Sequence, residues 1–315
     1  MDFPITDSNI KQHVNKYING RKDELPIELQ GLPIGQWNVS RVTNMSNMFS
    51  GATNFNEDIG NWDVSNVTFM SHMFKGATSF NQDLSGWDVS NVVTMISMFE
   101  GATSFNGNIG NWNVLSVQTM TNMFSGATSF NGNIGDWDVS RVTNMYSMFK
   151  GATSFNQDLT RWNVSRVISM AYMFLDATSF NVNIGDWDVS NVTSMYSMFK
   201  GATSFNQDLS RWDVSRVNAM EHMFEGATSF VINPNWNISQ QTNTRDMFKH
   251  TVFEPLGTFL YGSDALNKVT ENDPFRLNAQ TYIDLAQYLD VPGIRKDYET
   301  LDGRIAYLPK KRRRS

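Results

Sequence analysis

Residues 137–161 read WDVSRVTNMYSMFKGATSFNQDLTR, and this stretch is one copy of a unit that recurs along most of the chain. All nine tryptophans stand at the start of successive copies, at positions 37, 62, 87, 112, 137, 162, 187, 212 and 236. Their spacing is 25 residues in every step except the last, which is 24. A fixed period of this length is typical of arrays in which each unit packs only against its neighbours. The sequence therefore predicts a repeat solenoid.

Within one unit, the apolar spacing predicts a short helix from Ser140 to about Lys150. The apolar residues of 142–149 fall on one helical face, and Gly151 stands where a helix end favours a left-handed residue. Residues 155–159 read as a short strand, which needs copies from neighbouring units beside it. We therefore expect an α/β solenoid of nine right-handed rungs, each with one short parallel strand and one short helix.

Identical residues at one position of every unit predict continuous core ladders. The clearest are a phenylalanine column and a valine column, at 55, 80, 105, 130, 155, 180, 205 and 230 and at 64, 89, 114, 139, 164, 189 and 214.

The chain divides into four parts by this pattern. Residues 1–33 do not repeat; Ile10, Val14 and Tyr17 predict a helix that caps the first rung, with Asp7 or Ser8 as its N-cap and Gly20 as its end. Residues 34–249 form the array. Residues 250–309 form an α-rich C-terminal cap or a small appended module, with a helix predicted at 281–289. Residues 310–315 are a basic tail.

Composition excludes several kinds of site. The chain has no cysteine, so it has no disulfide and no thiolate metal site. The formal charge is -6, but Lys310, Lys311, Arg312, Arg313 and Arg314 contribute five of the 25 basic residues, so the remainder carries 20 basic and 31 acidic residues. The N-terminus lacks a signal-peptide pattern, and no apolar stretch approaches the ~20 residues that span a bilayer. We therefore expect an intracellular location rather than secretion.

The unit in residues 187–209, WDVSNVTSMYSMFKGATSFNQDL, resembles the BspA-like repeat family, also described as a repeat of unknown function in mycoplasma surface lipoproteins. The resemblance covers about residues 34–249. It implies a leucine-rich-repeat-like fold and a binding or surface role, in bacterial surface proteins or in large DNA viruses of protists. It brings no catalytic residues. The chain lacks the signal peptide and lipidated cysteine of the surface lipoproteins, which argues against an exported adhesin.

Two polar columns need a structural or a functional explanation. Aspartate or asparagine occupies positions 58, 83, 108, 133, 158, 183, 208 and 233. A row of calcium ligands is one interpretation, but free alternation of Asp and Asn suits acceptors for turn amides better. The asparagine column at 56, 81, 106, 131, 156, 181 and 206 is interpreted as a buried ladder that satisfies backbone groups.

The sequence predicts neither an enzyme nor a bound cofactor or metal. The four histidines are scattered, and His72 and His222 lie six rungs apart, so no nucleophile, base and orienting group can be assembled around them.

Three surface features are candidates for function. A mixed aromatic patch at Ile96, Tyr146, Tyr172, Leu175 and Tyr196 is a possible partner surface, since tyrosine is favoured at interfaces. A charge ladder at Asp136, Arg161, Asp186 and Arg211 places opposite charges one unit apart, and we expect it to fix the register of the rungs. The basic tail, Lys310–Arg314, is expected to contact an anionic partner.

The favoured interpretation is a non-enzymatic repeat protein that binds other proteins, for example as a structural or accessory component of a viral assembly. The alternative is a cell-surface adhesin that binds host protein or glycan. A nucleic-acid partner is expected only through the basic tail, because the rest of the chain is acidic and repels phosphate.

Overall fold

The computed structural model describes residues 3–230, 236, 238–239, 241–251, 298–301 and 304–307. The chain separates into two compact units, Met1–Thr251 and Val252–Ser315. In the second unit the described residues are two antiparallel strands, β1 (Tyr298–Leu301) and β2 (Arg304–Tyr307). The helix predicted at 281–289 and the basic tail Lys310–Arg314 lie outside the described residues.

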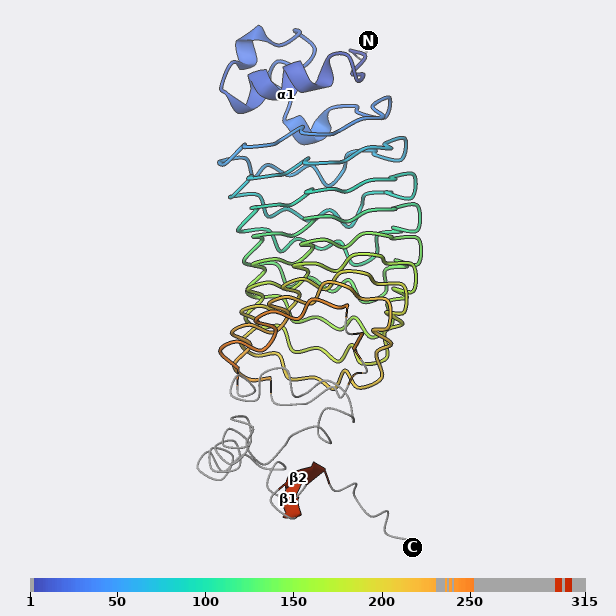
Figure 1. Ribbon diagram of the computed structural model, residues 1–315. Helices are drawn as coiled ribbons and strands as arrows, with labels where there is room; N and C mark the ends of the chain where they lie inside the picture. The colour runs from blue at the N-terminus through green and yellow to red at the C-terminus, as the bar shows by residue number, and fades with distance from the viewer. Residues whose placement is uncertain are drawn as a thin grey trace, which may run out of the picture. The chain divides into compact units, whose positions relative to one another are not determined.

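The first unit is a stack of regularly repeating rungs that follows a capping segment (Figure 1). Isolated parallel bridges join residues one repeat apart, from Asn44 with Phe69 through to Ala219 with Asn243. We call residues 140–151 and their equivalents in the other rungs the ladder segment. Backbone hydrogen bonds join each ladder segment to the next, so these segments run along one side of the stack. The first unit is therefore a repeat solenoid.

The prediction of one helix in each rung is wrong. The α-helix among the described residues is α1 (Ile10–Ile18), and two 3-10 helices, η1 (Lys22–Glu24) and η2 (Ile34–Gln36), follow it. Residues 140–141 and 146–151 form turns instead, on either side of the parallel bridge at Asn144. Ser147 and Gly151 both have left-handed backbones, with φ of 54° and 66°.

The hydrogen bonds of the ladder segment explain this error. The N–H groups of Ser147 and Phe149 donate to Ala171 and Met173 of the next rung, both at 2.9 Å, and Met148 N–H donates three residues back within its own rung, to Met145. A helix would use every amide within the same segment. Turns of three residues repeat apolar side chains at nearly helical spacing, so the sequence pattern could not separate the two.

The strand predicted at residues 155–159 is also absent, because the array holds no named strand among its described residues. Neighbouring rungs pair through the ladder segment instead. At Asn156 the link is a side chain, since the Asn156 N–H donates to Asn131 Oδ1 at 3.0 Å.

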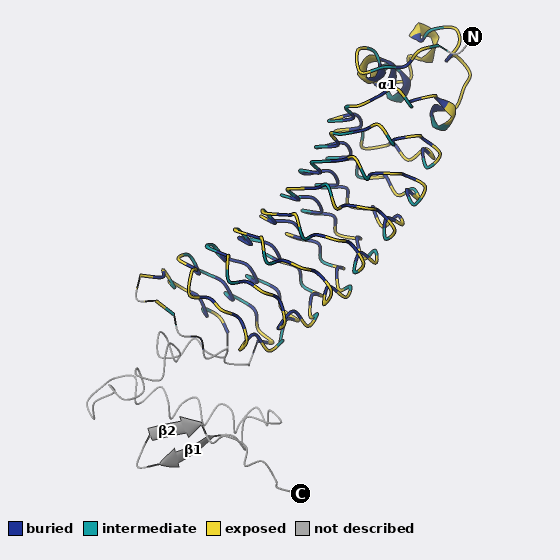
Figure 2. Cartoon of the chain, turned by 90° about the vertical axis from the view of Figure 1, so that its right-hand side faces the viewer, coloured by how far each residue is buried: buried dark blue, intermediate teal, exposed yellow. Residues whose placement is uncertain are grey.

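The predicted core columns are confirmed. Phe155 is fully buried, and its ring lies 4.1 Å from that of Phe149 and 5.8 Å from that of Phe130, measured between centroids. Successive tryptophan rings also stack, for example Trp112 on Trp137 at 6.2 Å. Buried and exposed residues alternate along each rung (Figure 2). The core is thus a set of aromatic ladders that run through the stack.

The helix predicted in the N-terminal segment forms as α1. Ile10, Val14 and Tyr17 are buried on one helix face. The Tyr17 ring packs edge-on against Trp37 of the first rung at 5.4 Å, and its hydroxyl donates to Glu57 at 2.6 Å. After the helix, Gly20 has a left-handed φ of 73°, which ends it as expected.

Asp7 is not the N-cap of this helix. Asn9 precedes α1 and makes no side-chain cap bond. The Asp7 carboxylate instead accepts hydrogen bonds from the N–H and hydroxyl of Thr43, at 2.8 and 2.6 Å, and from the Asn44 N–H at 3.0 Å. In the next rung the equivalent amide, Thr68 N–H, donates to the Thr43 carbonyl. The first ladder segment has no preceding rung, so the Asp7 carboxylate supplies the acceptors that its amides would otherwise lack.

Replacing Asp7 by alanine should destabilise the solenoid in a pH-dependent way. Burial opposes ionisation of Asp7, but hydrogen bonds from Thr43 and Asn44 outweigh it and lower the pKa of this carboxyl. A lowered folded-state pKa contributes stability above the unfolded-state pKa and loses it as pH falls through the folded-state value. At pH 7 we expect Asp7→Ala to cost about 1–2 kcal/mol, and the difference from wild type should shrink below about pH 4.

Denaturant unfolding of both proteins at pH 7 and pH 3 measures this difference. Asp23→Ala removes a carboxylate from η1 that makes no described side-chain contact, and should change stability little at either pH. A cost at Asp7 that stays the same at both pH values would show that the carboxylate charge is not what stabilises the first rung.

Candidate functional site

Three tyrosines from successive rungs form one row on the ladder side of the solenoid. The rings of Tyr146 and Tyr172 lie 5.3 Å apart and those of Tyr172 and Tyr196 lie 5.0 Å apart, at interplanar angles of 69° and 54°. His222 continues the row, with its ring 5.6 Å from Tyr196. We call Tyr146, Tyr172 and Tyr196 the tyrosine surface. The structure thus brings together three of the five residues of the predicted patch.

The row zigzags because its residues occupy two neighbouring repeat positions. Tyr146 and Tyr196 each precede a buried serine, whereas the middle rung reverses the order, with buried Ala171 before Tyr172. Tyr172 therefore adopts a left-handed φ of 60°. Such a backbone is strained for a bulky residue. The ladder imposes this conformation on the equivalent residue of every rung, and these residues are Asn47, His72, Ser97, Asn122, Ser147, Tyr172, Ser197, His222 and Asp246.

The other two residues of the predicted patch, Leu175 and Ile96, are not part of the tyrosine row. Leu175 shares a rung with Tyr172, is partly buried, and its N–H donates to the Tyr172 carbonyl at 3.1 Å. Ile96 lies two rungs before Tyr146, so it is not part of the row. Ile168 is 52% exposed in the same rung as Tyr172 and was not among the predicted patch residues. Its signal was an isoleucine at a position where the neighbouring units carry threonine.

The tyrosine surface is only partly exposed. Tyr146 exposes 38% of its surface, and Tyr172 and Tyr196 expose less. Burial, together with the neighbouring Tyr196 and Tyr146, raises the pKa of Tyr172. A side-chain interaction with Tyr196 and the negative charge of Glu221 raise this pKa further.

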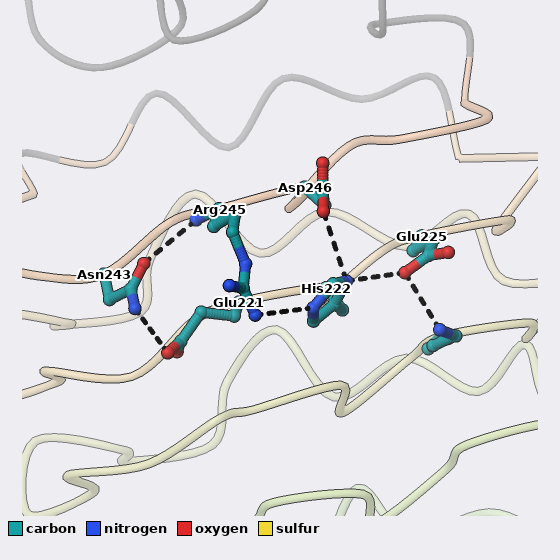
Figure 3. Close-up of polar contacts among 7 residues, drawn as sticks. Glu221, His222, Glu225, Asn243, Arg245 and Asp246 are labelled. Atoms are coloured by element: carbon teal, nitrogen blue, oxygen red, sulfur yellow. Dashed lines mark hydrogen bonds and ion pairs between the residues drawn. The ribbon is translucent and has the colours of Figure 1, made fainter.

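A polar cluster lies at the end of the row (Figure 3). His222 Nδ1 lies 2.6 Å from Glu225 Oε2, and the same carboxylate oxygen accepts from Lys200 Nζ at 2.9 Å. Asp246 lies 3.9 Å from His222 Nδ1, and Arg245 lies 3.5 Å from its Nε2. Burial opposes ionisation of Glu225, but the contacts with Lys200 and His222 outweigh it and lower the pKa of Glu225. The cluster therefore holds its carboxylate ionised and ties three rungs together.

The cluster also contains a hydrogen bond between neighbouring rungs, in which Asn243 Nδ2 donates to Glu221 Oε1 at 2.5 Å. Sequence analysis noted His222 only as an isolated histidine. In the sequence, the cluster is indicated by Lys200 and Glu225, which stand one repeat apart. Lys75 and Glu100 have the same spacing and form an ion pair at 3.0 Å.

The predicted charge ladder consists of two separate ion pairs among the described contacts. Arg161 lies 2.6 Å from Asp136, and Arg211 lies 2.6 Å from Asp186. All four side chains are largely exposed, so each pair contributes about 0–1 kcal/mol. A role in fixing the register of the rungs stays a prediction.

The repeat itself identifies the family. The family described as "Mycoplasma protein of unknown function, DUF285" matches residues 26–120, 107–186 and 162–255. The chain belongs to this family. The three matches together span the whole array, which confirms the resemblance seen in the repeated unit. Comparisons with curated proteins and with solved structures gave no match.

The polar columns of this DUF285 array are explained by hydrogen bonding. Asp58, Asn108 and Asp158 each accept from the backbone N–H two residues later, so they stabilise turns as acceptors for amides. Backbone and side-chain hydrogen bonds from Thr160 lower the pKa of Asp158. The asparagine column does link rungs, with the Asn81 N–H donating to Asn56 Oδ1, but its residues are mostly exposed rather than buried as predicted.

The described residues offer no larger or more polar site than the tyrosine surface and the polar cluster. None of their His, Asp and Glu side chains form a group of three or more that could hold a metal ion. One cavity, lined by Thr160, Asn183 and Trp187 among others, has a volume of about 10 Å³, enough for about one water molecule. Among the same residues, no helix combines the length and apolar character that crossing a bilayer requires. The candidate site is accordingly the tyrosine surface.

Proposed function

We propose that the solenoid is a non-enzymatic protein-binding module and that its partner docks on the tyrosine surface. The observation that carries this proposal is that the fold does not need these tyrosines. At the repeat position of Tyr146 and Tyr196, other rungs carry small polar residues such as Ser46, Ser71 and Thr121, with the same backbone ladder. Tyrosines held in a row without a role in the core are typical of binding surfaces.

The rigidity of the row supports the same proposal. The three rings pack against one another, and the ladder fixes the backbone that carries them. Side chains that are already ordered lose less conformational entropy on binding, so more of the contact energy remains for affinity. Tyrosine also combines a large apolar ring with a hydroxyl that can form hydrogen bonds.

We further propose that the rungs follow the right-handed path of a leucine-rich-repeat-like solenoid. The support is the parallel bridge between each pair of successive rungs, because connections between parallel segments are almost always right-handed. An experimental structure of residues 1–251 tests this directly, and a left-handed path would contradict it.

Affinity purification from native material tests the binding role. Wild type is compared with the triple variant Tyr146→Ser/Tyr172→Ser/Tyr196→Ser, in which a small polar side chain replaces each aromatic ring. The control is Asp136→Asn/Asp186→Asn, which alters two exposed ion pairs outside the ladder segment. All three proteins should show the same melting temperature within a few degrees, because the substituted side chains are not in the core.

We expect a protein that wild type and the control retain and that the tyrosine variant loses. Equal recovery of the same proteins by all three variants would contradict docking at this surface. A glycan array with the same proteins examines the adhesin alternative, which would replace the proposal if glycans bound in a tyrosine-dependent manner and no protein did.

A further inference from the structure

The ladder segments contain more basic than acidic residues, although the array as a whole is acidic. The nine ladder segments contain nine lysines and arginines against five aspartates and glutamates. The residues between them, within 34–250, contain two arginines against twelve acidic residues. The basic residues of the ladder segments are Arg41, Lys75, Arg141, Lys150, Arg166, Lys200, Arg216, Arg245 and Lys249, and the acidic ones are Glu100, Asp176, Glu221, Glu225 and Asp246. Five of the acidic residues outside these segments each accept a hydrogen bond from the first residue of a ladder segment and so lie at its N-terminal end; they are Asp63, Asp88, Asp138, Asp188 and Asp213.

Three cations in the rungs of Tyr146 and Tyr172 have no ion pair among the described residues. Arg141, Lys150 and Arg166 belong to the rungs of Tyr146 and Tyr172, are exposed, and make no ion pair or side-chain hydrogen bond with any described residue. Asp176 is the acidic residue in the same two ladder segments. One rung further, Lys200 is neutralised by Glu225. The ladder segments of these two rungs therefore carry three cations against one acidic residue.

We propose that the partner on the tyrosine surface presents an extended acidic peptide segment, an inference that rests on the proposed function. Carboxylates of the segment pair with Arg141, Arg166 and Lys150, while apolar side chains pack on the tyrosine rings and on exposed Ile168. Arginine suits this role because its planar group binds a carboxylate through two hydrogen bonds.

The size of the row also fits a short peptide. Tyr146, Tyr172, Tyr196 and His222 come from four successive rungs, which span roughly 14 Å at the ~4.8 Å spacing of paired backbones. An extended chain covers that distance with about five residues. A segment of this length needs no fold of its own, and its alternate side chains point toward and away from the surface.

The ring geometry disfavours a single-stranded nucleic acid as the anionic partner. Base stacking needs aromatic faces that are open to the ligand. Here neighbouring rings meet at 69° and 54° with centroids 5.3 and 5.0 Å apart, so each ring covers part of the next. A peptide side chain can pack on ring edges and reach the hydroxyls, whereas a row of stacked bases cannot.

A displayed library of random 12-residue peptides, selected on the full-length protein, tests the inference. We expect the selected peptides to be enriched in aspartate and glutamate relative to the unselected library. One such peptide, and a counterpart with Asn and Gln in place of Asp and Glu, are then titrated by fluorescence polarisation, with the oligonucleotide dT12 as a competitor. Binding should weaken as salt rises and should not be competed by dT12.

Matched variants locate the binding. Arg141→Gln/Lys150→Gln/Arg166→Gln should weaken binding of the acidic peptide at least tenfold. The control is Arg41→Gln, at the same repeat position as Arg141 but four rungs away, and it should change binding less than twofold. Thermal unfolding verifies that each variant keeps its fold.

Several outcomes overturn the inference: no peptide is selected, the selected peptides show no excess of acidic residues, the charge variant binds as wild type does, or dT12 displaces the peptide. A native partner that depends on the tyrosines but not on Arg141, Lys150 and Arg166 would leave the proposed function standing and reject the acidic segment. A native partner that does not need the tyrosines would reject the proposed function itself.

Discussion

Phe155→Ala should lower the free energy of unfolding by about 3–5 kcal/mol. Phe155 is fully buried at the middle of the array, between Phe130 and Phe180 of the adjacent rungs and against Phe149 of its own rung. Alanine would leave a cavity that the neighbouring ladders cannot fill, because each ring is held in register by the rungs above and below it. The cost combines the lost burial of the ring with this cavity.

The same substitution should change the shape of the unfolding curve. Stability in a repeat array is carried by the interfaces between neighbouring units. A weak central interface divides the array, so we expect the single transition of wild type to separate into two. Tryptophan fluorescence during denaturant unfolding reports on this, because every rung carries one tryptophan.

Tyr146→Ala is the matched control, since it removes a large ring that is 38% exposed and lies outside the core. It should cost less than about 1 kcal/mol. If Phe155→Ala and Tyr146→Ala had equal effects, the phenylalanine column would not be the core ladder of the fold.

Trp137→Phe should cost about 2–3 kcal/mol, whereas Trp37→Phe should cost less than about 1 kcal/mol. Both indoles are almost fully buried. The Trp137 Nε1–H donates to the Ile109 carbonyl of the preceding rung at 3.0 Å. Trp37 belongs to the first rung, and its Nε1 has no hydrogen-bond partner among the described residues.

The two substitutions remove the same volume and differ in the hydrogen bond. At Trp137 phenylalanine removes a bond between rungs, although the Ile109 carbonyl keeps its second donor, the Trp112 N–H. At Trp37 phenylalanine removes a buried donor that has no described acceptor, which offsets part of the cost of the smaller ring. Equal losses of unfolding free energy in the two variants would show that the indole bonds between rungs do not stabilise the array.

The repeat architecture could be predicted from the sequence alone. A tryptophan every 25 residues and a phenylalanine at a constant distance from it require that equivalent residues stack, because otherwise each unit would leave its apolar side chains in water. The N-terminal helix could also be predicted, since Ile10, Val14 and Tyr17 have helical spacing.

The path of the chain inside each rung could not be predicted in this way. Residues 142–149 repeat their apolar side chains at a spacing that both a helix and a series of turns produce. The choice depends on where the backbone amides find acceptors, and here alternate amides find them in the next rung. Those acceptors exist only after the rungs have stacked, so no local property of residues 140–151 reveals them.

The candidate site likewise combines features that the sequence predicts with features that only the tertiary structure shows. The sequence identifies Tyr146, Tyr172 and Tyr196 as unusual residues in a regular pattern, and it places Asp136 and Arg161 one repeat apart. Only the tertiary structure shows that the ring of Tyr172 packs against the rings of the other two tyrosines. It alone also shows that Asp7 binds the first ladder segment instead of capping α1. The reason is physical: periodicity determines which residues are equivalent, whereas contacts between residues that are not equivalent depend on how the stacked backbone directs each side chain.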